Sequence, residues 1–208
     1  MKHHLKALAV ATTLLVLPLI AYSQTSTPDA QAPVTGHREA MRMVPARAVL
    51  LRTLDAKDDH AGSTFQAKLV QKVTLTDGTV LPNDTILAGE VTVDDLQQKG
   101  TSTLAIRFNQ AHLKNGSVVP IKATIVGFYV PRGGGWHVYP VRPGDQVPNS
   151  WNDGSLQFDQ ISVVSDVDLH SKISSANSGV FVSTKKDNIK LDEGSEIQFA
   201  IAPGPTTP

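Results

Sequence analysis

The chain has 208 residues, with 19 acidic and 19 basic residues and no cysteine. The lack of cysteine excludes a disulfide framework. The balanced charge argues against a nucleic-acid partner, which would need a basic face to neutralise phosphates, and against a polybasic membrane patch. We therefore expect a domain that is stabilised by its hydrophobic core.

The first segment has the layout of a secretory signal peptide. A short basic head, MKHHLK, precedes an apolar run from Ala7 to Ala21, and small residues lead to a cleavage site after Ser23. The run is shorter than the roughly 20 residues that span a bilayer, and Pro18 interrupts it. Cleavage would leave 17 basic against 19 acidic residues, a net charge of −2. We expect residues 1–23 to be removed and the protein to be exported to the periplasm, the cell envelope or the exterior; an uncleaved anchor is the alternative.

Two polar segments flank the predicted domain. Residues 24–43 are rich in Pro, Thr, Ala and Gln and show almost no aliphatic pattern, which is typical of a flexible lead-in. The closing APGPTTP is predicted not to continue a strand, because its prolines lack ladder donors, so residues 203–208 are expected to be a disordered tail. One packed domain is expected over residues 44–202.

A period of two residues dominates this domain. In TFQAKLVQKVTL, apolar Phe65, Ala67 and Leu69 alternate with polar residues, which is typical of a strand with one face in a core and one in water. With no convincing helix after the signal, we predict an all-β fold, a single antiparallel barrel or sandwich. The same alternation appears in TLAIRF, IKATIVGFYV and EIQFAIA, and further strands are predicted at 47–54, 85–93, 161–169 and 180–184.

A phrase of the form Leu-x-x-Gly-Ser/Thr occurs at residues 75–81, 113–119 and 191–197. Asp-Gly and Asn-Gly in the first two copies predict type I′ hairpin turns, which need positive φ at both central positions. A Pro follows each of these copies, which indicates an edge, a bulge or a kink, and their spacing suggests a structural half-repeat. The predicted structural turn residues are Gly78, Pro82, Gly116, Pro120 and Gly194.

The segments around these turns resemble the C-terminal β-barrel domain of the TrbI-type conjugal-transfer family, from the core complexes of type IV secretion systems. The likeness lies in VTLTDGTVLPNDTILAGEV, LAIRFNQAHLKNGSVVPIKATIVG and NIKLDEGSEIQFAIA. It implies a barrel in the bacterial cell envelope. Asp84 stands where the family prefers Gly, and a Gly/Pro-rich stretch from Pro131 to Gly154 replaces the family's membrane-crossing helical pair. The resemblance therefore does not imply a secretion channel.

Both tryptophans of the chain fall in this Gly/Pro-rich stretch. The stretch reads as a long surface excursion or a partly ordered lid. Aromatic side chains on a loop of a rigid β scaffold often bind sugars, peptides or a partner protein, although they can instead pin the loop to the barrel. The candidate binding residues are Arg132, Trp136, His137, Tyr139 and Trp151.

Candidate metal ligands occur in SDVDLHS, where a strand would point Asp166, Asp168 and His170 to one face. Such a row spans about 13 Å, so one ion would need further ligands from another strand. Carboxylates suit Ca²⁺ or Mg²⁺, and His with carboxylate suits Zn²⁺ or Mn²⁺; the alternative is a solvated face whose charges resist edge pairing. The loop DAKDDHAGS could likewise cap a cation or be an ordinary surface loop; its polar residues are Asp55, Asp58, Asp59 and His60.

Catalytic motifs are lacking: there is no Gly-x-Ser-x-Gly elbow and no His-Glu-x-x-His pair. We expect a non-enzymatic structural or protein-interaction domain of the cell envelope, without a cofactor and without a membrane span once the signal is removed. Its expected partner is an envelope protein or a glycan. The alternatives are a carbohydrate- or ligand-binding protein that uses the Trp136–Trp151 region, and a metal-dependent hydrolase built on Asp166, Asp168 and His170.

Overall fold

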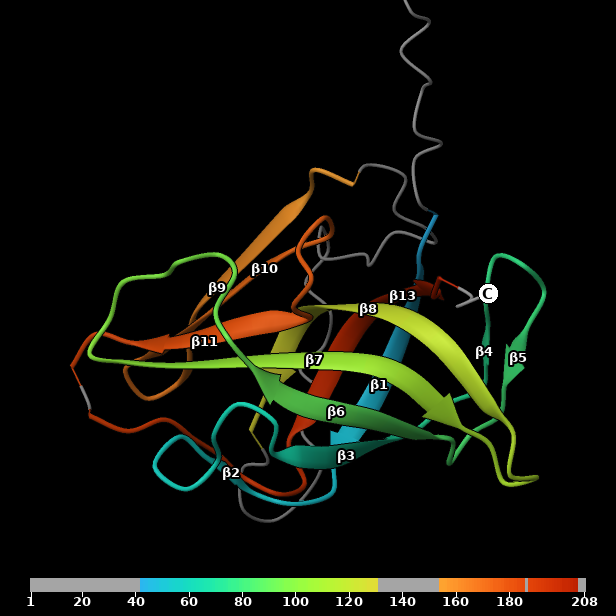
Figure 1. The fold of residues 1–208 in the computed structure, drawn as a ribbon, viewed down its shortest axis with the longest axis horizontal. Coiled ribbons are helices and arrows are strands. Elements are labelled where there is room, and N and C mark those ends of the chain that lie inside the picture. Colours follow the sequence, from blue (N-terminus) through green and yellow to red (C-terminus); the bar gives the residue numbers. More distant parts are fainter. Residues whose placement is uncertain (1–41, 131–153, 186, 206–208) are drawn as a thin grey trace, which may run out of the picture. The chain divides into compact units, whose positions relative to one another are not determined.

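The computed structural model describes residues 42–130, 154–185 and 187–205, and these residues form strands joined by turns and loops, with no helix. This confirms the all-β class predicted from the alternation. The strands, shown in Figure 1, are β1 (Val44–Leu50), β2 (Leu54–Asp55), β3 (Thr64–Leu69), β4 (Val73–Thr74), β5 (Val80–Leu81), β6 (Ile86–Thr92), β7 (Ser102–His112), β8 (Val118–Tyr129), β9 (Gln157–Val164), β10 (Val167–Lys172), β11 (Gly179–Ser183), β12 (Lys190–Leu191) and β13 (Glu196–Pro203).

Six of the strands close into an antiparallel barrel. Their order is β6-β3-β1-β13-β8-β7, and the pairing of β6 with β7 joins the two ends. Of the two architectures that the sequence left open, the structure is therefore the barrel. Closure removes the open edges that a flat sheet of the same strands would expose to other chains.

Apolar side chains of the alternating strands fill the barrel. Phe108 of β7 packs edge-on against both Phe65 of β3 and Phe199 of β13, with 5.1 Å between ring centroids in each pair. Aromatic rings prefer this geometry because the edge and the face of a ring carry opposite partial charges. Gly89 of β6 makes room for these rings, since a Cβ there would lie 2.6 Å from the Phe65 ring. The core thus explains a glycine in the middle of a strand.

Strands β11, β10 and β9 extend the sheet beyond the barrel, on the left of the view in Figure 1. The extension begins where β8 leaves β7 after Pro120, and β11 pairs with the other end of β7. Ser178 fills this fork. Its N–H donates to Ile106 O at 2.8 Å, its hydroxyl accepts from Phe108 N at 2.9 Å, and its carbonyl accepts from Ile125 N at 2.7 Å. One residue therefore ties the extension to both strands of the fork.

Three predicted boundaries differ from the structure. Segment 161–169, predicted as one strand, holds the end of β9, a turn and the start of β10, because Asp166 has a φ of 63°, which a strand does not allow. Segment 47–54 bends after Leu50, so its end forms β2 in a different sheet. β13 reaches Pro203, so the closing APGPTTP does continue a strand. As the last residue of β13, Pro203 lacks a donor only at the strand end.

The hairpin turns at Asp-Gly and Asn-Gly share one geometry. Gly78 N donates to Leu75 O at 3.0 Å and Leu75 N donates to Thr79 O at 2.8 Å, and the turn around Gly116 repeats both bonds. The φ angle is 87° at Gly78 and 84° at Gly116, but Asp77 and its counterpart are not among the residues with positive φ. The type I′ prediction is therefore wrong. The loop is a type I turn followed by a left-handed glycine, and Asp77 instead accepts from Thr79 N at 2.9 Å.

The third copy of the phrase, around Gly194, forms a corner rather than a hairpin. It joins β12 to β13, which lie in different sheets. The same corner occurs where β5 meets β6. Gly194 N donates to Leu50 O and Asp84 N donates to Leu69 O, both at 2.9 Å, and φ is 81° at Gly194 and 61° at Asp84. Each corner thus ties its left-handed residue to the end of a neighbouring long strand.

These corners belong to an internal repeat of the barrel. β1 and β2 with β12 and β13 repeat the arrangement of β3 and β4 with β5 and β6. The two copies meet where β1 pairs with β3. The register is the same in both: Leu54 pairs with Leu191 as Val73 pairs with Leu81, and Val49 pairs with Glu196 as Lys68 pairs with Ile86.

This repeat differs from the half-repeat suggested by the spacing of the first two phrases. Pro82 opens the corner between β5 and β6, where its carbonyl accepts from the Thr85 hydroxyl at 2.7 Å. Pro120 instead lies inside β8, opposite Gln110, where β8 leaves β7. The two phrases therefore share a turn but not the structure that follows it.

Candidate functional site

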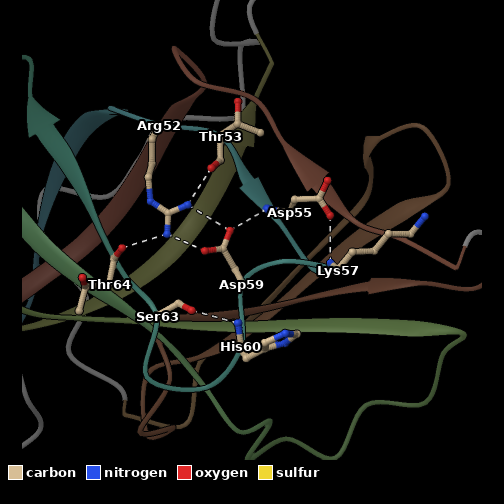
Figure 2. A network of polar contacts seen from close by, with 8 residues as sticks. All are labelled: Arg52, Thr53, Asp55, Lys57, Asp59, His60, Ser63 and Thr64. Atoms are coloured by element: carbon tan, nitrogen blue, oxygen red, sulfur yellow. Dashed lines mark hydrogen bonds and ion pairs between the residues drawn. The ribbon is translucent and has the colours of Figure 1, made fainter.

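One ion pair holds the loop between β2 and β3, as Figure 2 shows. Two nitrogens of the Arg52 guanidinium donate to the two carboxylate oxygens of Asp59, at 3.1 and 2.6 Å. The guanidinium also donates to the main-chain oxygens of Thr53 and Thr64, both at 2.9 Å, and Asp59 accepts from Asp55 N at 2.9 Å. A forked pair of this kind fixes geometry as well as charge, because two parallel hydrogen bonds must be satisfied together.

These contacts account for the carboxylates that the sequence suggested as a cation cap. The hydrogen bond from Arg52 holds the pKa of Asp59 below its ordinary value. A hydrogen bond from the backbone N–H of Lys57 likewise lowers the pKa of Asp55. Asp58 is exposed. The loop therefore uses its buried acid to fasten itself to the end of β1, and His60, the other candidate ligand, is also exposed.

A second polar cluster ties the β6–β7 loop to the β10–β11 loop. The Asp95 carboxylate accepts from the Ser175 hydroxyl, from Ala176 N and from the Asn177 side-chain amide, each at 2.8 Å. Asn177 continues the network by accepting from the Thr92 hydroxyl at 2.6 Å. Burial acts to raise the pKa of Asp95, but these hydrogen bonds outweigh it and leave the pKa below its ordinary value. Asp95 is therefore an ionised latch between two loops.

Lys122 lies beside this latch, on β8. Its ammonium donates to the Ser175 carbonyl. Burial lowers the pKa of Lys122; the charge of Asp95 opposes that change and the charge of Arg107 adds to it. No local pattern marks this cluster in the sequence, because Asp95 and Ser175 are 80 positions apart. The only usable signal was a pair of acids in a loop, which most surface loops also contain.

The residues predicted to form a metal-binding strand face are only partly brought together. Asp168 and His170 share one face of β10, while Val167 between them and the barrel-facing Leu169 are buried, as the alternation predicted. Asp166 is not on this strand. It lies in the preceding turn, with its carboxylate 3.2 Å from the Lys185 ammonium. The prediction of one row of three ligands is therefore wrong for Asp166, because its positive φ ends the extended backbone.

The other two residues of that face have separate partners. Asp168 accepts from Ser162 N at 2.8 Å, and His170 Nδ1 lies 2.7 Å from Asp159 Oδ1. Both contacts cross from β10 to β9. Within the residues that the structure describes, no group of three or more His, Cys, Asp or Glu side chains is placed to hold a metal ion. Asp168 and His170 thus fasten the edge strand to its neighbour.

The predicted binding residues fall between β8 and β9, outside the described residues. The structure describes the chain up to Val130 and again from Gly154, so this interval connects the open end of β8 to the outermost strand of the sheet. Binding of a ligand or a partner there stays a prediction. The residues concerned are Arg132, Trp136, His137, Tyr139 and Trp151.

A hollow of about 380 Å³ lies where the two copies of the internal repeat meet. Val49 and Val70 line it together with the charged Lys68, Asp84 and Glu193. Its volume is at the small end of the range of ligand sites, about 300–1,000 Å³. Charges of both signs line it, so the hollow shows no preference for an anion or a cation.

Comparison with protein-family models and with curated proteins finds no match for this chain. In the described part of the chain, no helix is long and apolar enough to cross a membrane. Function is therefore inferred from the sequence and from the contacts of the described side chains.

Proposed function

We propose that the protein is an exported β-barrel domain of the cell envelope with a structural or protein-interaction role and no catalytic activity. The use of its charged side chains carries this proposal. Asp59, Asp95 and His170 are each held in a contact that fastens one loop or strand to another. Acid–base or nucleophilic chemistry instead needs a side chain that is positioned and yet able to reach a substrate.

The export and envelope parts of the proposal rest on the sequence. Residues 1–23 combine a basic head, an apolar run and small residues before the cleavage site, which favours a cleaved signal peptide. The turn phrases resemble those of the TrbI-type family, and a closed barrel is the fold that this resemblance implies. We include that relationship in the proposal, without the secretion channel, because the helical pair of the family is replaced in this sequence.

The test is to express the full chain with a C-terminal tag in a bacterium, crosslink intact cells and separate the compartments. We expect a chain beginning at Gln24 in the periplasmic or envelope fraction, with one envelope partner recurring between preparations. A chain without residues 1–23 serves as the control and should stay in the cytoplasm without that partner. Recovery of the exported chain as a free monomer without any crosslinked partner would contradict the proposal.

A further inference from the structure

The edge of β8 that faces away from β13 is completed in an unusual way. β8 pairs with β7 at Val118–Pro120 and with β13 at Ile121–Tyr129. Beyond Pro120, the backbone groups on the side once occupied by β7 have no ladder partner among the described strands. Buried N–H and C=O groups need partners, so this edge must be satisfied by other means.

Individual groups from the extension complete this edge. Ile125 N donates to Ser178 O at 2.7 Å, and Ile125 O accepts from the Ser171 hydroxyl. Further along, one side chain serves both backbone groups of Phe128: its N–H donates to Gln160 Oε1 at 2.9 Å, and its carbonyl accepts from Gln160 Nε2 at 3.2 Å. A side-chain amide offers the same donor and acceptor as a peptide group. Gln160 therefore stands in for one residue of a neighbouring strand.

The strand that carries Gln160 is weakly buried compared with the barrel strands. β9 is the last strand of the sheet, and four of its eight residues are exposed in the first six positions, including Ile161 at 80 %. Ser162 interrupts it with a φ of 55°, and its pairing with β10 is irregular before Leu169. Segments with few buried apolar contacts open at lower free energy than the core of a protein. Gln160 can thus leave Phe128 without opening the barrel.

We infer that Gln160 is an exchangeable cap on a strand edge, and that β8 at Phe128 accepts an extended peptide segment of a protein partner when this cap withdraws. The occupant is an extended chain because Phe128 offers one N–H and one C=O on the same side, which a main-chain peptide group of an added strand would pair. The Phe128 ring itself packs against Phe181 in the core, with ring centroids 5.1 Å apart, so recognition here is by main chain. The inference rests on the proposed interaction role and names its surface.

The cap is tested by hydrogen exchange of backbone amides, followed by NMR, on the full chain and its Gln160→Ala variant. We expect the Phe128 amide to exchange about 10-fold faster or more in the variant, while the amides of β1 and β13 keep their rates. Gln157→Ala is the matched control on the same strand, because Gln157 contacts Asp159 and not β8. A Phe128 amide that exchanges at the rate of the slowest barrel amides in both proteins would overturn the cap.

The acceptor edge is tested with a probe peptide that copies β9, residues 157–164, with blocked ends. Added to Gln160→Ala, it should restore slow exchange at Phe128, and an N-methylated version of the same peptide should not, because it lacks main-chain donors. Equal effects of the two peptides, or none, would overturn the edge. Protection of Phe128 that rises with protein concentration alone would assign the edge to a second copy and overturn the partner. A recurring crosslinked partner in cells would survive these failures, so the two proposals are distinguishable.

Discussion

Asp58 and Asp59 show how differently two adjacent carboxylates are used in this protein. The Asp59 side chain is 11 % exposed and takes both terminal nitrogens of Arg52, whereas Asp58 faces water. The difference arises because Arg52 reaches across the loop to one of them and continues to the Thr64 carbonyl. At this scale, the partner of a side chain decides its role.

We predict that Asp59→Asn lowers the free energy of unfolding by about 1–2 kcal/mol. The amide keeps the shape of the carboxylate but not its charge, and it cannot accept with both of its ends. Arg52 is 39 % exposed, so solvent screening keeps the loss below that of a fully buried ion pair. Urea unfolding would measure it. Asp58→Asn is the control, expected within about 0.5 kcal/mol of the parent. Similar losses in both variants would argue against the ion pair as the fastening of the loop.

At the scale of elements, the two corners around Asp84 and Gly194 are the same device built from different residues. Both place a residue with positive φ where its N–H reaches the end of a neighbouring long strand. Glycine adopts this conformation without strain, and aspartate tolerates it better than most residues. The repeat therefore indicates which substitutions each corner accepts.

We predict that Gly194→Asp costs less than about 1 kcal/mol of unfolding free energy, because aspartate already occupies the equivalent place in the other corner. Gly194→Val should cost about 1–3 kcal/mol, because a β-branched residue is strained at a φ of 81°. Urea unfolding of the two variants would separate them. Equal costs would mean that the two corners are not equivalent.

At the scale of the whole molecule, the paired carboxylates set the response to acid. Hydrogen bonds hold the pKa values of Asp59 and Asp95 below the ordinary value of about 3.9. A carboxyl whose pKa is lower in the folded state contributes stability above the unfolded pKa and loses it as the pH falls through the folded pKa. The barrel should therefore lose stability on acidification below about pH 4.

We predict that Asp95→Asn weakens this acid response. The variant should be less stable than the parent at pH 7, and the difference should shrink as the pH falls below about 4, where the parent carboxyl becomes protonated as well. Urea unfolding of both proteins from pH 7 down to about pH 2.5 would measure it. A difference that stays constant across this range would mean that the charge of Asp95 is not what holds its two loops together.

The sequence by itself determined the class of the fold and the inward faces of its long strands. Phe65, Leu69, Phe108 and Phe199 were predicted to face the core because a period of two is a local property of an extended chain, visible without any partner. The need for glycine at Gly78 follows from the same local geometry.

The tertiary structure alone decided which strands close the barrel, where β8 leaves β7, and which groups complete its edge. Gln160 and Phe128 are 32 positions apart, and no local pattern marks them as partners. The phrase at Gly194 looks like the hairpin phrases, but it forms a corner because its strands pair with β2 and β1 rather than with each other. Such pairings depend on register and closure between distant segments, which the local alternation of a strand does not encode.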